Sequence, residues 1–115
     1  MLTLTSATKI YLVAGPTDMR KQFDSLAAVV SGKLKADPHS GHVFVFCNRR
    51  KTLVKILFWD NDGSGFWVCA KRLERGRFTW PDGAEPTCEM SSEELSILLA
   101  GVDLHGARRR RWYER

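Results

Sequence analysis

The residues of this sequence with the most evident chemistry are cations gathered in two short segments. The first segment reads KRLERGR and contributes Lys71, Arg72, Arg75 and Arg77. The second lies in and just after NRRK and contributes Arg49, Arg50, Lys51 and Lys55. Guanidinium groups bind phosphate oxygens in pairs and displace the counterions of a nucleic acid. These segments predict a phosphate-binding surface, for which a solvated loop balanced by Glu74 is the alternative.

Two further cations, Arg20 and Lys21, fall where a helix is expected to begin, with Thr17 as its N-cap. Cations in a first helical turn oppose the helix macrodipole, at about 0.3–1 kcal/mol each. Two explanations of their presence stay open. They form a compact anion site with Thr17, Asp18 and free backbone N–H groups, or they pair locally, Arg20 with Asp24 and Lys21 with Asp24 or Asp18.

The C-terminal segment 105–115 is a third basic region, with Arg108, Arg109, Arg110 and Arg111 in one run. Such a composition cannot bury a core, so we expect a disordered tail after a single folded domain over residues 1–104. Trp112 and Tyr113 have no core to join and are therefore the best candidates for stacking on bases.

Acidic side chains offer one catalytic alternative, because Asp60, Asp62 and Glu74 could share a metal ion for phosphoryl transfer. The surrounding DNDGSG is first of all a turn signal, so we expect no catalytic residues, no metal and no cofactor. Three cysteines, an odd number without metal-ligand spacing, are expected to be reduced thiols.

Composition limits the class of protein. The chain has 115 residues, 43% of them hydrophobic, and a net charge of +5, which indicates one small domain with a polyanionic partner. We expect a cytoplasmic protein, because the sequence shows neither a membrane-spanning apolar run nor a signal peptide. Charge is segregated: residues 49–77 hold eight cations against three acids, whereas 78–104 hold six acids and no Lys or Arg.

The elements expected to position these residues form an α+β domain. Strands are predicted at 9–14, 42–47, 52–59 and 66–71, the last three as an antiparallel meander. Helices are predicted from about Asp18 to Lys35 and from a capping box at Ser91 and Glu94 to Gly101. Lys55 interrupts an apolar strand face, which suggests a solvated face open to a ligand.

Six aromatic residues lie among the central cations, and most of them are expected in the core, because so small a domain needs large apolar side chains. An exposed subset would be able to stack on bases. The six are Phe58, Trp59, Phe66, Trp67, Phe78 and Trp80.

Three stretches carry a resemblance to a known family. GPTDMRKQFDSLAAVV, the run from GHVFVFC to RFTWP, and the late LLAGVDL resemble the small TnpB-type, or second-frame, accessory protein of the insertion sequence 66 family of bacterial transposons. Gln22 stands in place of the glycine expected after Asp-Met-Arg-Lys. The resemblance implies a part in transposition beside a separate, larger transposase.

Together these observations predict a non-catalytic nucleic-acid-binding accessory factor in DNA transposition. Its expected partners are DNA, in particular transposon ends, and the transposase of the same element. The alternatives are an adaptor that docks the transposase through the acidic stretch 82–94 without contacting DNA and, third, a metal-dependent nuclease.

If the tail follows the phosphate backbone, cutting the chain after Leu104 will weaken binding to specific and random duplex nearly equally. Four consecutive arginines cannot all reach base edges from one helix or strand face. The log–log salt slope should flatten by about three to four units, since each phosphate contact contributes roughly 0.9. Loss of discrimination for the terminal repeats, with random binding intact, would show instead that the tail reads a groove.

Overall fold

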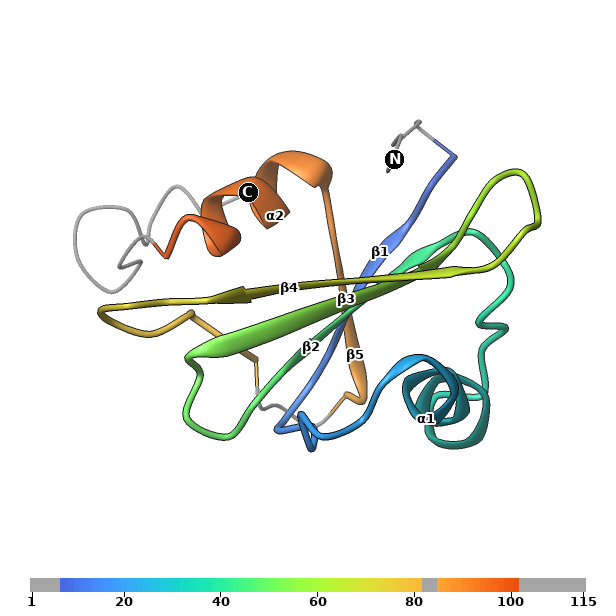
Figure 1. Ribbon diagram of the computed structural model, residues 1–115. Helices are drawn as coiled ribbons and strands as arrows, with labels where there is room; N and C mark the ends of the chain where they lie inside the picture. The colour runs from blue at the N-terminus through green and yellow to red at the C-terminus, as the bar shows by residue number, and fades with distance from the viewer. Residues whose placement is uncertain (1–6, 82–84, 102–115) are drawn as a thin grey trace.

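The computed structural model describes residues 7–81 and 85–101, which form a five-stranded sheet with one helix on each face (Figure 1). The elements follow one another as β1 (Ile10–Val13), α1 (Phe23–Ala28), the π-helical turn η1 (Val29–Lys33), β2 (Val43–Cys47), β3 (Leu53–Trp59), β4 (Phe66–Arg72), β5 (Thr87–Met90) and α2 (Ser92–Leu99). The predicted tail lies outside the described residues, and so do Trp112 and Tyr113. No helix in the described ranges is long and apolar enough to cross a bilayer.

The strand order is β4-β3-β2-β1-β5. Antiparallel pairing of β2, β3 and β4 confirms the expected meander and the α+β class. Two features extend that expectation. β1 pairs parallel with β2 through the crossover of α1 and η1, and the short β5, which the sequence analysis missed, pairs antiparallel with β1. The sheet is therefore mixed, with β2 at its centre and β1 between β2 and the edge strand β5.

Alternate strand residues face two separate apolar clusters, as the two-residue period of a strand requires. The cluster beneath α2 consists of Ile10, Leu12, Val43, Val45, Cys47, Val54, Phe58, Phe78, Trp80, Met90, Leu95 and Leu98. The cluster beneath α1 and η1 consists of Val13, Leu26, Val30, Phe44, Phe46 and Leu57. Both faces of the central strands are thus covered.

Three of the six aromatic residues lie in the core as expected, while Trp59 and Phe66 are half-buried. Phe58, Phe78 and Trp80 are buried, and the indole N–H of Trp80 donates to the carbonyl oxygen of Val13 at 3.0 Å. This contact ties the segment after β4 to the end of β1. Trp67 differs, because its side chain is 43% exposed.

The three thiols are free, and they differ in exposure: Cys47 is buried, Cys88 is half-buried and Cys69 is exposed. Burial raises the pKa of the Cys47 thiol to about 11. Cys69 is consequently the thiol most open to reagents.

The first helix begins later than expected. Gln22 rather than Thr17 is its N-cap, and the backbone N–H of Gln22 donates to Ser25 Oγ at 2.9 Å. Gln22 has φ −123° and ψ −153°, extended backbone that any residue adopts, so this chain needs no glycine there. Thr17 does not cap the helix because its backbone N–H donates to the Cys47 carbonyl at 2.8 Å, which holds it beside the end of β2.

The second helix confirms its predicted capping box. Ser91 Oγ accepts from the Glu94 N–H at 3.1 Å, and Glu94 Oε1 accepts from the Ser91 N–H at 2.9 Å. Gly101 follows the helix at φ +73°, the left-handed conformation typical of a helix end.

Replacing Ser91 by Ala should lower the free energy of unfolding by about 1 kcal/mol, because an N-terminal amide of α2 loses its acceptor. Urea denaturation measures the change. The matched control is Ser92→Ala, one residue into the helix, for which we expect a change below about 0.5 kcal/mol. Equal losses in the two variants would contradict the capping role.

Candidate nucleic-acid interface

The turn between β2 and β3 is organised by Asn48. Its Oδ1 accepts from the backbone N–H groups of Thr52 at 2.9 Å and Leu53 at 3.0 Å, and its own N–H donates to the Leu53 carbonyl at 3.0 Å. Lys51 closes the turn with φ +63°. Arg49 and Arg50 are left exposed at the tip, between the hydrogen-bonded residues Asn48 and Lys51.

The second basic segment lies beside this turn, because strand register brings it there. Arg72 at the end of β4 pairs with Leu53 at the start of β3. Beyond the strand, the Leu73 N–H donates to the Thr52 carbonyl at 2.9 Å, and the Phe78 N–H donates to the Lys51 carbonyl at 2.7 Å. The two segments, far apart in sequence, therefore meet at one end of the sheet.

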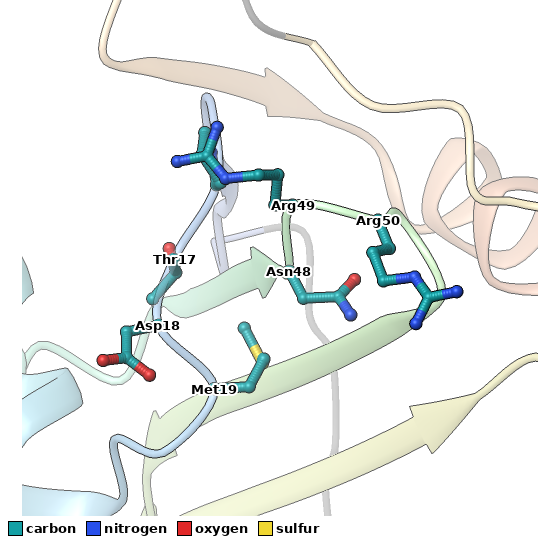
Figure 2. A pocket seen from close by; sticks show the side chains of 7 residues that line it. Thr17, Asp18, Met19, Asn48, Arg49 and Arg50 are labelled. Atoms are coloured by element: carbon teal, nitrogen blue, oxygen red, sulfur yellow. The ribbon is translucent and has the colours of Figure 1, made fainter.

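Two shallow clefts open at this end. One, of about 320 Å³, is lined by Arg49, Arg50, Lys51, Thr52 and Arg77. The other, of about 410 Å³, is lined by Pro16, Thr17, Asp18, Met19, Asn48, Arg49 and Arg50. Figure 2 shows the side chains of Arg49 and Arg50 leaving the turn in different directions, Arg49 toward the loop that carries Thr17. The turn thus presents a guanidinium on each side.

Lys55 does not belong to this exposed set, and the expectation of a solvated strand face around it is wrong. The residue is only 7% exposed. Its Nζ donates to the carbonyl oxygens of Met19 at 2.8 Å and Lys21 at 2.9 Å. The cation interrupts the apolar pattern because it binds the backbone of the loop before α1.

Arg20 and Lys21 lie in that loop and not in a helical turn, so the cost of opposing a macrodipole does not arise. Arg20 pairs with Asp18 and not with Asp24: its Nη2 lies 2.7 Å from Asp18 Oδ2 and its Nε 3.0 Å from Asp18 Oδ1. The Arg20 side-chain hydrogen bonds, followed by its backbone N–H bond, hold the pKa of Asp18 well below its usual range. Local pairing thus occupies Arg20 and Asp18, two groups of the expected anion site, whereas no ion pair among the described residues involves Lys21.

Lys71 and Arg72 point to opposite faces of the sheet, since they pair with the neighbouring residues Val54 and Leu53. Lys71 Nζ donates to the Leu99 carbonyl at 2.7 Å, at the end of α2. Cations are favourable at that helix end. Lys71 therefore contacts α2, and the cluster 71–77 is not one continuous clamp.

The remaining arginines have no ionic partner in the described part of the chain. Within residues 7–81 and 85–101 no ion pair involves Glu74 or the following side chains: Arg49, Arg50, Arg72, Arg75 and Arg77. Glu74 thus forms no ion pair with these arginines, and six cations against this one acid give this end of the sheet a net positive charge. We refer to these five arginines and Lys51 as the basic end.

The three acids considered for a metal site do not come together. Asp60 and Asp62 form the turn between β3 and β4, where Asp60 Oδ2 accepts from the Trp67 indole N–H and the Asp62 N–H lies 3.1 Å from Asp60 Oδ1. These two bonds, the indole first, lower the pKa of Asp60. Glu74 follows the other end of β4, and the seven residues of that strand, about 20 Å in length, separate it from the turn with Asp60 and Asp62. In the described ranges no three His, Cys, Asp or Glu side chains are placed to share a metal.

The sequence of the chain matches one known protein family over most of its length. The family described as IS66 Orf2 like protein matches residues 8–109. The chain belongs to the IS66 Orf2-like family. Membership of this family implies an accessory role in transposition.

Relatives of this IS66 Orf2-like chain occur in Sinorhizobium fredii (strain NBRC 101917 / NGR234). The uncharacterized protein y4hO is 40% identical over 103 residues, which cover 90% of this chain and 88% of the relative. The uncharacterized protein y4jC is 36% identical over 103 residues, covering 90% and 86% respectively. No solved structure shows significant similarity.

Sequence reasoning missed two contributors to the site of this IS66 Orf2-like chain. Asn48 was overlooked, although an asparagine directly after a buried strand is a typical turn organiser. The lining of the larger cleft by Pro16 to Met19 had no local signal, because it depends on the long-range contact between Thr17 and Cys47.

Replacing Lys55 by Met should reduce the free energy of unfolding by about 2–3 kcal/mol, because two carbonyls lose a charged donor while the side-chain volume is nearly kept. Urea denaturation measures the loss, and hydrogen exchange should rise in residues 17–22. The matched control is Lys71→Met, whose exposed ammonium contacts one helix-end carbonyl and should cost below about 1 kcal/mol. If the two variants lose similar free energies of unfolding and hydrogen exchange in residues 17–22 is unchanged, then Lys55 does not hold this loop.

Proposed function

We propose that this protein is a non-catalytic nucleic-acid-binding accessory factor in DNA transposition, acting beside a separate transposase. The observation that supports this proposal is the meeting of two distant arginine segments at the basic end, without acidic partners among the described residues. Exposed arginines beside a rigid turn are suited to phosphate oxygens, since the planar guanidinium binds them in two places.

Rigidity adds to the suitability of this surface. The backbone of the turn is held by Asn48, and the segment after β4 is held by the buried Phe78 and Trp80. Arg49, Arg50 and Arg77 consequently leave anchored positions, and less conformational entropy is lost when a polyanion binds. Phosphate contacts of this kind position a protein on DNA without reading its sequence.

The proposal contains no chemical step. The three acids considered for a metal site, Asp60, Asp62 and Glu74, are divided between the two ends of β4, and Asp60 and Asp62 act as turn residues. Two-metal phosphoryl transfer needs carboxylates that share ions about 4 Å apart.

An adaptor role is the second candidate, and the separation of charge supports it. Glu85 and Glu93 are exposed around β5 and α2, and Ile97 on α2 is an exposed large apolar residue. A basic transposase surface would be complementary to this region. In that case the basic end would only repel wrong partners.

Binding of the full chain to terminal-repeat and random duplex across a salt series separates the two candidates. We expect a log–log slope near −4 in magnesium-free buffer if four or five cations contact phosphate, and no nicking when magnesium is added. Arg49→Gln with Arg50→Gln should flatten the slope by about two units. A wild-type slope near zero would remove the nucleic-acid proposal and favour the adaptor.

The matched control removes two cations elsewhere, with Lys33→Gln and Lys35→Gln at the end of η1. Its slope should stay within about half a unit of the wild-type slope, because these side chains are remote from the basic end. Equal flattening in both pairs would mean that net charge alone attracts DNA and that the basic end is no site.

A further inference from the structure

The outer edge of the sheet at β4 is a long, regular strand with a free side. Its seven residues pair with β3 in continuous register, without a bulge or proline. Figure 1 shows β4 as the outermost strand, with α2 above one end of it. The first five residues are uncharged, so the usual protection of an edge by charge is missing over most of its length.

The hydrogen-bond pattern identifies which backbone groups point outward. Just before the paired region the Asp60 N–H donates to the Gly65 carbonyl, and just after it the Leu73 N–H donates to the Thr52 carbonyl. Bonded pairs alternate along an antiparallel ladder, so Trp67, Cys69 and Lys71 direct their backbone groups toward β3. The amides and carbonyls of the four intervening residues then face away from the sheet: Phe66, Val68, Ala70 and Arg72. Within the described part of the chain no backbone hydrogen bond reaches them.

The sequence of β4, FWVCAKR, has aromatic residues at one end and cations at the other. If two copies align antiparallel about Cys69, Trp67 lies opposite Lys71 of the partner subunit, and Phe66 lies opposite Arg72 of the partner subunit. Cations favour aromatic neighbours, and such cross-strand pairs stabilise a sheet. A parallel alignment would instead place each cation beside its own copy. The strand therefore complements itself in one direction only.

We propose that β4 pairs antiparallel with β4 of a second copy of this chain, joining two five-stranded sheets into one of ten strands. The outward backbone groups fit this alignment. Val68 forms a hydrogen-bonded pair with Ala70 of the partner subunit, and the two-fold axis passes between Cys69 and Cys69 of the partner subunit. Trp67 lies against Phe58, with ring centroids 6.2 Å apart, and still keeps an exposed surface for the Lys71 stem of the partner subunit. The pairing does not depend on the proposed nucleic-acid function.

Cys69 reports on this geometry. At a non-hydrogen-bonded pair on the axis, the two Cys69 Cα atoms would lie about 4.5 Å apart, close enough for a disulfide. Cys47 is buried and Cys88 half-buried, so they serve as internal controls. The strand pairing itself needs no disulfide.

Sedimentation equilibrium of the full chain in reductant, over a concentration series, should show a dimer. Ala70→Pro removes an outward N–H but none directed to β3, and it should weaken the dimer at least about tenfold, since the loss occurs twice. Ala70→Ser is the matched control and should remain dimeric, with circular dichroism establishing that both variants fold. A wild-type monomer at every concentration would overturn the proposal, as would a dimer unaffected by Ala70→Pro.

Oxidation by diamide gives an independent measurement, since it converts two neighbouring thiols to one disulfide. The wild type and Cys88→Ser should form covalent dimers, whereas Cys69→Ser should not. Ala70→Pro keeps the Cys69 thiol but should lose the cross-link. A chain that dimerises only after residues 105–115 are removed would show that its own tail occupies the edge, which would overturn pairing in the intact protein.

Discussion

The buried ammonium of Lys55 joins the middle of the sheet to the loop that precedes α1. Two backbone carbonyls on that loop point inward and meet it, while the apolar neighbours of Lys55 exclude water from most of its side chain. A buried cation without such acceptors would be strongly unfavourable. The loop therefore cannot move away from the sheet cheaply, and one wall of the larger cleft stays next to Arg49.

The charged surface follows from strand register more than from any single motif. Leu53 opposite Arg72 brings two basic segments to the same end, and the return of the chain to Lys51 through Phe78 keeps them there. The same register sends Asp60 and Asp62 to the opposite end. The same strand pairing thus brings the two basic segments together and separates Glu74 from Asp60 and Asp62.

Local features of the sequence were sufficient for α2 and for the meander of β2, β3 and β4. Capping at Ser91 and runs of β-branched and aromatic residues act over a few positions, and they agree with the final packing. The start of α1, the strand β5 and the role of Lys55 were not accessible in this way. Each depends on a partner far along the chain: Thr17 on Cys47, Leu12 on Cys88, and Lys55 on Met19. For the candidate site, the arginine clusters were visible in the sequence, but their adjacency required the register.

The position of β1 inside the sheet also affects how the chain folds. β1 is synthesised well before one of its neighbours, β5, because α1 and the three other strands lie between them in the sequence. The meander can close through short turns, whereas the pairing of β1 with β5 joins Ile10 to Met90 across most of the chain, and such contacts are slow to form. During synthesis the apolar side of β1 at Ile10 and Leu12 is therefore uncovered until β5 and α2 emerge, and the nascent protein is most prone to aggregation in that interval.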